Sequence, residues 1–118
     1  MSRRHNGLAG ERQLHHQAPI FAALGDARRL TLLTRLSDAR PRSISQLAEG
    51  SRISRQAITK HLRVLEGAGL VRAQIAGREC LYEFEPKSLN EANRYLELVS
   101  RQWEQALNRL KSFVENQD

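Results

Sequence analysis

Two serine-capped helices in the middle of the chain constrain the fold more than any other feature. Ser45 can cap a short helix over residues 46–49, and Gly50 breaks that helix. After a tight turn, Ser54 caps a longer helix over residues 55–66. A short helix, a turn of three to four residues and a second capped helix predict a helix-turn-helix.

Two further helices are expected before this pair. Residues 17–24 form the first, with Pro19 in its first turn. Asp26 caps the second, over residues 27–36, where leucines recur at helical spacing. Residues 1–16 are polar and lack periodicity, so we expect a flexible basic arm there.

A β-hairpin is expected directly after the second capped helix. Residues 70–75 and 79–84 form its strands, and Gly77 lies in the turn between them. A hairpin this short is marginal alone in water and must pack against the helices. The sequence therefore predicts a mainly α fold with a small β-hairpin, a winged helix-turn-helix over residues 17–86.

A long helix is expected at the end of the chain, over residues 89–115 with Ser88 as its cap. Its apolar residues recur at alternating steps of three and four, which is a heptad seam that favours a partner helix. We expect residues 87–118 to form a dimerisation helix within the same compact unit, with a second copy of the chain as its partner. The seam residues are Leu89, Ala92, Leu96, Val99, Trp103, Ala106, Leu110 and Phe113.

Positive charge is concentrated in the middle of the chain. Residues 28–78 hold 11 Lys/Arg against 3 Asp/Glu, a net charge of +8, whereas residues 79–118 hold 5 against 8, a net charge of −3. The whole chain carries a net charge of +6. Such asymmetry indicates a polyanion that one part of the fold contacts, although ordinary surface charge is the alternative.

The outer face of the second capped helix carries the groups that read DNA. At 100° per residue, Leu62 and Leu65 fall within about 40° of Ile58 and point to the core with it. The opposite face offers an amide, an ammonium and a guanidinium, with a threonine at its edge. Amides pair with adenine, cationic groups with guanine, and the threonine methyl meets the thymine methyl.

These positions give a candidate double-stranded DNA interface. We expect base contacts from Gln56, Thr59 and Lys60. We expect phosphate contacts from Ser54, Arg55, Arg63, Arg72 and Arg78. An exposed polar helix face without a partner is the alternative for the first set, and a solvated hairpin is the alternative for the two arginines of the hairpin.

Other function classes leave no signature. No apolar run approaches the roughly 20 residues of a membrane span, so we expect a cytoplasmic protein with no membrane partner. No glycine-rich phosphate loop, paired carboxylates or nucleophile with an evident base is found, so an enzyme is not expected. A protein-docking adapter that uses the long terminal helix is the alternative to a DNA reader.

The stretches IFAALGDARRLTLLTRL and SISQLAEGSRISRQAITKHLRVLEGAGLVRAQIAGRECLYEFEP resemble the ArsR/SmtB family of bacterial repressors, over residues 19–86. The most specific parts are Gly25-Asp26-x-x-Arg29-Leu30 and the run from Lys60-His61-Leu62-x-x-Leu65 to Ala68-Gly69-Leu70-Val71. The resemblance implies a winged-helix homodimer that represses transcription on an inverted-repeat operator and leaves DNA when an effector binds.

The sequence departs from the metal-sensing members of that family. Those members carry paired cysteines on the first helix of the helix-turn-helix or histidine ligands on the last helix, yet residues 43–51 hold no Cys and residues 89–118 no His. The single cysteine, Cys80, is expected to be a buried, inert thiol, and an intersubunit disulfide is the alternative. We therefore expect no metal and no cofactor, a branch of the family without metal ligands, and an effector, if one exists, that is an unidentified small molecule.

Overall fold

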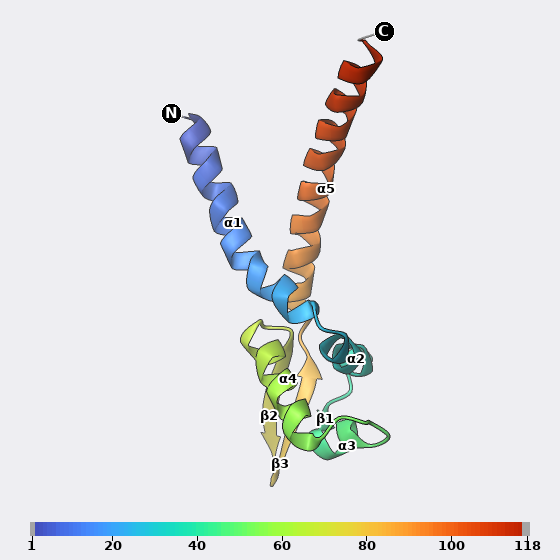
Figure 1. Cartoon of the computed structure of the whole chain (residues 1–118). Helices are drawn as coiled ribbons and strands as arrows, with labels where there is room; N and C mark the ends of the chain where they lie inside the picture. The colour runs from blue at the N-terminus through green and yellow to red at the C-terminus, as the bar shows by residue number, and fades with distance from the viewer. Residues whose placement is uncertain (1, 117–118) are drawn as a thin grey trace.

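A computed structural model describes the backbone of residues 2–116 and the side chains of residues 11–116. Within these ranges the fold is mainly helical with one small sheet, which confirms the expected fold class (Figure 1). The elements are α1 (Ser2–Leu24), α2 (Ala27–Leu36), β1 (Arg42–Ser43), α3 (Ile44–Ala48), α4 (Arg55–Gly67), β2 (Val71–Ala76), β3 (Glu79–Phe84) and α5 (Pro86–Glu115).

The core lies where α2, α3 and α4 meet the start of β2. Six large apolar side chains are fully buried there: Leu36, Leu47, Ile58, Leu62, Leu65 and Leu70. Three of them are the residues expected to anchor α4, so the predicted rotation of that helix is confirmed. The opposite face of α4 is left free to meet solvent.

The sheet has three antiparallel strands in the order β1-β3-β2, one more than expected. In the additional strand, β1, Arg42 pairs with Tyr82 and Ser43 with Leu81. A strand of two residues is too short to leave a periodic pattern, so only the tertiary structure reveals it. The added strand ties the hairpin to the base of α3.

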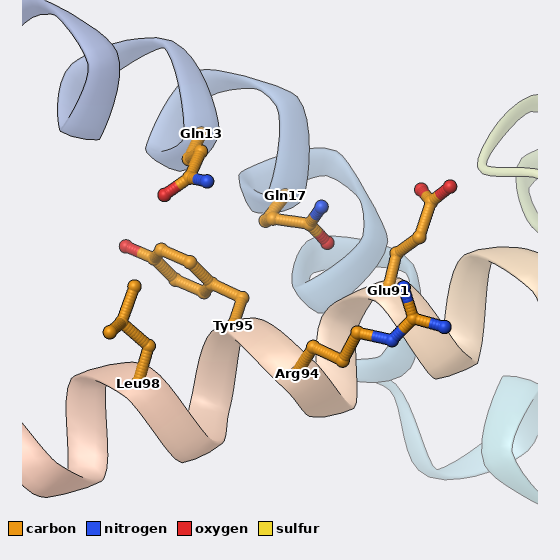
Figure 2. A pocket seen from close by; sticks show the side chains of 6 residues that line it. All are labelled: Gln13, Gln17, Glu91, Arg94, Tyr95 and Leu98. Carbon is orange, nitrogen blue, oxygen red and sulfur yellow. The ribbon is translucent and has the colours of Figure 1, made fainter.

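The first helix is longer than expected, because α1 begins at Ser2 and runs unbroken through the segment expected to be a flexible arm. Pro19 lies inside α1 rather than in its first turn. Contacts with α5 account for the second half of the added segment, since Gln13 and Gln17 (Figure 2) and His16 face the last helix and tertiary packing stabilises a weakly periodic segment.

Two helix caps also differ from expectation. Ser43, not Ser45, caps α3: its hydroxyl accepts from the Gln46 amide at 3.2 Å, and the Gln46 side chain accepts from the Ser43 amide at 2.9 Å. Glu85, not Ser88, caps α5, because Pro86 at the first turn has no N–H to satisfy and lets the helix start directly after β3. The last two residues of the expected C-terminal segment, 117–118, lie outside the described range.

The molecule is elongated, measuring 67 × 35 × 22 Å with a radius of gyration of 19.6 Å. A compact domain of this length has a radius of gyration of about 13.5 Å. The excess comes from α1 and α5, which diverge from the core as two long arms (Figure 1). None of the helices in the described ranges combines the length and apolar character that a bilayer crossing requires.

Candidate nucleic-acid interface

Helix α4 is fixed at its start and along one face. The Ser54 hydroxyl accepts a hydrogen bond from the Ala57 amide at 3.1 Å, which satisfies one of the unpaired N–H groups at the helix start. Ile58, Leu62 and Leu65 are each 0 % exposed. The remaining free N–H groups and the helix dipole make the exposed start of α4 favourable for a phosphate.

The three residues expected to contact bases lie together on the outer face of α4. Gln56 and Lys60 are exposed, and Thr59 is half-buried. The Thr59 hydroxyl donates to the Arg55 carbonyl oxygen at 2.8 Å. Its proton is therefore committed to the helix, and Thr59 can offer a base its methyl group and the hydroxyl oxygen as an acceptor. Within the described residues, the side chains of Gln56 and Lys60 are open to solvent.

Two arginines of the basic segment hold the helices together instead of facing solvent. Arg29 Nε donates to the Ala23 carbonyl at 2.7 Å and Nη2 donates to the Ala22 carbonyl at 3.1 Å, at the end of α1. Arg35 donates to the carbonyl oxygens of Leu47 and Gln46 in α3. These charge-assisted bonds reach carbonyls in the last turns of α1 and α3, two of which, Ala22 and Gln46, also accept from a main-chain amide.

Arg42 is a third structural arginine. Its guanidinium forms a two-pronged ion pair with Asp38, at 2.7 and 3.0 Å, and also donates to the Arg35 carbonyl. The hydrogen bonds from Arg42 and from the Arg40 amide lower the pKa of Asp38 to about 2. The pair closes the loop between α2 and β1.

Arg72, expected to contact phosphate, is also engaged within the chain. Its guanidinium lies 2.6 Å from Glu83 Oε1 and 3.4 Å from Glu85 Oε2, and the hydrogen bond to Glu83 raises the pKa of Arg72. Two carboxylates offset its charge, and Arg72 links β2 to β3. Sequence reasoning missed this because the cross-strand register of the hairpin was not known.

Fewer cationic side chains remain free at the surface than the count of Lys and Arg in residues 28–78 suggested. Arg55, Arg63 and Arg78 are exposed as expected. Two more exposed arginines, Arg28 and Arg52, line a cleft of about 500 Å³ between α2 and the turn before α4. Their charge was counted in the basic segment, but only the fold shows that they lie beside the start of α4.

The hairpin ends in a tight turn at Gly77, whose φ of +65° suits a glycine, with Arg78 next to it. Ile75 is 83 % exposed and pairs across the strands with Cys80. Cys80 is exposed, so the expectation of a buried thiol is wrong. The hairpin extends beyond the core at this point, and no helix covers its tip.

Helix α5 carries an exposed apolar stripe over its second half. Trp103, Leu110 and Phe113 are 60–67 % exposed, and Leu96 is 49 % exposed. The start of the expected seam is different: Ala92 is buried at 1 % exposure, and Leu89 packs against the core. Those two residues belong to the interior of one chain, because α5 crosses the end of α1 before it extends away. They are therefore not available to a partner.

In the part of the chain that the structure describes, no three His, Cys, Asp or Glu side chains gather where they could hold a metal ion. His61, on α4, is half-buried.

The chain was compared with known proteins. A family model described as a helix-turn-helix domain matches residues 16–74. The transcriptional regulator Rv2034 of Mycobacterium tuberculosis is 30% identical over 97 residues, which are 82% of this chain and 87% of Rv2034. An ArsR-like transcriptional regulator from Rhodococcus sp. RHA1 superposes with a TM-score of 0.74 at 38% identity, covering 84% of this chain and 92% of that one.

A further solved structure shares the fold at lower identity. The domain of Mb0332 from Mycobacterium bovis is described as a homodimeric winged helix-turn-helix DNA-binding domain. It superposes with a TM-score of 0.60 at 23% identity, over 75% of this chain and 82% of that domain.

Proposed function

This chain belongs to the ArsR-type winged helix-turn-helix transcriptional regulators, and from that premise we propose that it is a homodimeric repressor that reads an inverted-repeat DNA site. Proteins of this family regulate transcription and are not enzymes. The repressor role, the two-fold site and the residues that read it are the parts that we propose.

The exposed outer face of α4 carries the proposal. Gln56, Thr59 and Lys60 occupy the first half of the helix, where recognition helices meet base edges. The major groove admits one α-helix, and the fully buried opposite face keeps α4 from rotating away. Arg55, Arg63 and Arg78 are placed on either side to hold phosphates, and we add Arg28 and Arg52 to them and withdraw Arg72.

The elongated shape supports a homodimer. An arm such as α5, with Trp103, Leu110 and Phe113 more than half exposed, gains stability when a second copy covers it. The homodimeric state described for the Mb0332 domain is consistent with this arrangement. A two-fold dimer presents two α4 helices, so the half-sites should lie about one helical turn of DNA apart.

We further propose that release from DNA does not depend on a metal ion. Metal-sensing members of the family carry their ligands on the first helix of the helix-turn-helix or on the last helix. In this chain, residues 43–51 contain no Cys and residues 89–118 contain no His. A zinc titration of the complex with DNA tests this point. Dissociation at stoichiometric zinc would contradict it.

The first prediction tests sequence-specific binding. The DNA upstream of the protein's own gene and a scrambled duplex of equal length are titrated by fluorescence anisotropy over a series of salt concentrations. We expect the affinity for the upstream DNA to exceed that for scrambled DNA by about 10³ or more. Equal affinities for the two duplexes would end the proposal and leave the protein-docking role of α5 as the better account.

Two classes of variant separate base reading from phosphate binding. Gln56→Ala and Lys60→Ala should each weaken specific binding by about 1–3 kcal/mol and relax specificity. Arg78→Ala should weaken binding to both duplexes equally and flatten the dependence of log K on log salt by about one unit. Arg72→Ala is the matched control, since its charge is already offset, and should change the salt dependence less than Arg78→Ala does.

A further inference from the structure

The two faces of the β2–β3 hairpin differ in chemistry. Side chains alternate between the faces of a strand, and directly paired residues share a face. In the two strands, which the structure describes in full, one face is uncharged and consists of Val71, Ala73, Ile75, Cys80, Tyr82 and Phe84. All charged side chains of the strands, Arg72, Glu79 and Glu83, lie on the other face.

The uncharged face begins in the core and ends in solvent. Val71 and Tyr82 are buried, whereas Ile75 is 83 % exposed, more than any other large apolar side chain among the described residues. Its cross-strand partner Cys80 is exposed too. A lone apolar side chain on a surface is ordinary, but these two continue the buried face beyond the helices that cover it. The fold therefore leaves apolar surface that only a partner from outside the chain can cover.

The exposed pair lies next to the DNA-reading helix and away from the apolar stripe of α5. Strand β2 contacts α4, and Figure 1 shows the hairpin running back along that helix, with its tip beyond the helix start. The C-terminal half of α5, which carries the stripe, lies toward the opposite end of the molecule (Figure 1). A second copy that covers the stripe therefore leaves Ile75 and Cys80 accessible.

The charges around the pair favour nucleic acid as its partner. Arg78 is exposed in the turn beside the pair. The carboxylates of Glu79 and Glu83 lie on the other face, so a polyanion can approach the uncharged face without meeting a carboxylate of the strands. A second copy docked through the same pair would instead bring two Arg78 side chains together.

We propose that Ile75 and Cys80 contact the sugar walls of the minor groove next to the major groove that α4 enters. The contact rests on the proposed DNA binding and adds an apolar component to it. Proteins that enter the minor groove combine basic side chains with apolar ones such as isoleucine, and Arg78 supplies the basic group here. Apolar contact releases no counterions, so its contribution to affinity does not change with salt concentration.

A salt series separates this contact from a phosphate contact. Ile75→Ala should weaken binding to the upstream DNA about three- to tenfold at every salt concentration, with the slope of log K against log salt unchanged. Gln74→Ala, at the neighbouring exposed position on the charged face, is the matched control and should change affinity less than about twofold. Thermal melting checks that both variants keep the fold. Equal losses of affinity in the two variants contradict the proposal.

Cys80 reports on the contact in the unaltered protein, because it is the single cysteine of the chain and is exposed. Its alkylation by iodoacetamide, an uncharged reagent, is followed by mass spectrometry for the free chain and for the chain saturated with upstream DNA. We expect DNA to slow the reaction at least about tenfold, because alkylation requires an accessible thiolate.

The electrostatic field of DNA also lowers the thiolate fraction, so a control must separate this field from coverage. A variant with Cys80→Ser and Gln74→Cys places the single thiol on the charged face at the same level of the hairpin. Its alkylation should be slowed less by DNA than that of Cys80. Equal slowing of the two thiols contradicts the proposal.

The experiment distinguishes failure of this contact from failure of DNA binding. Specific DNA binding, measured by anisotropy on the same samples, without protection of Cys80 overturns the contact and leaves the repressor function standing. Absence of specific DNA binding overturns both. Protection of Cys80 in the free chain that grows with protein concentration shows that a second copy covers the pair, which also overturns the contact.

Discussion

At the scale of single residues, arginines that count equally toward net charge have different tasks. Arg29, Arg35 and Arg42 donate to main-chain carbonyls inside the fold, whereas Arg28 and Arg52 remain at the surface beside the start of α4. Hydrogen bonds from an arginine to main-chain carbonyls contribute to the stability of the fold. An arginine that stays free at the surface contributes to counterion release when DNA binds. The two tasks can be separated by substitution.

Arg35→Met and Arg28→Met form a matched pair for this purpose. Arg35→Met removes the guanidinium donor of the Leu47 carbonyl and one of the two donors of the Gln46 carbonyl, which keeps the Glu49 amide. It should lower the free energy of unfolding by about 1.5–3 kcal/mol. Arg28→Met should leave stability within about 0.5 kcal/mol and instead reduce the salt dependence of DNA binding. Urea denaturation at one fixed protein concentration measures the first effect, and anisotropy measures the second. Equal stability losses in the two variants would refute the division.

The Asp38–Arg42 pair predicts a pH dependence. The pKa of Asp38 is lowered to about 2 in the folded chain, below its value of about 3.9 in an unfolded one. The pair therefore stabilises the fold above pH 4, and this contribution is lost as the pH falls from about 4 to 2.

Asp38→Asn should flatten the fall in melting temperature over that window and leave its pH dependence unchanged above pH 5. Glu104→Gln, at an exposed carboxylate on α5, is the control and should reproduce the parent profile. A parent-like slope for Asp38→Asn would show that the carboxylate has the same pKa in both states.

At the scale of elements, each helix of the helix-turn-helix begins at a serine cap. The sequence alone identifies one of these two caps correctly and the other incorrectly. Ser54 is followed by a long amphipathic helix and was assigned correctly. Ser43 and Ser45 both precede a short helix, α3, and only the structure shows that Ser43 forms the capping box with Gln46.

Ser43→Ala should lower the free energy of unfolding by about 1 kcal/mol, because the Gln46 amide loses its acceptor. Ser45→Ala, an exposed position inside the first turn of α3, should change stability by less than about 0.5 kcal/mol. Chemical denaturation of both variants compares them directly. A larger loss for Ser45→Ala would restore the cap that the sequence suggested.

At the scale of the whole molecule, one chain is an incomplete unit. Its radius of gyration of 19.6 Å reflects two arms that diverge from the core, and one of them carries the apolar stripe. Covering that stripe with a second copy removes apolar surface from water at about 25 cal/mol per Å². The DNA-reading face of α4 and the stripe on α5 are separate surfaces, so dimerisation can place two α4 helices without obstructing them.

Trp103→Glu places a charge in the stripe and should shift the chain from dimer to monomer in sedimentation velocity at micromolar concentration. Gln105→Glu adds the same charge on the opposite side of α5, about 160° away, and should leave the dimer intact. An unperturbed dimer for Trp103→Glu would show that the stripe is not the interface.

The sequence by itself determined the elements whose apolar residues repeat over several turns. The positions of α2 and α4, the inward face of α4, the two strands of the hairpin and the length of α5 all follow from local periodicity and capping, which act between residues close in the chain. For the same reason the candidate base-reading face could be placed from the sequence: it is the side of α4 opposite its buried residues.

Only the tertiary structure decided the features that depend on residues far apart in the chain. The strand at Arg42–Ser43 exists because β3 pairs with it, and the second half of α1 packs against α5. The pairing of Arg72 with Glu83 and the burial of Ala92 have the same origin. Contacts between distant segments leave no local pattern, so a side chain's residue type alone could not show whether it faces a partner inside the chain or one outside it.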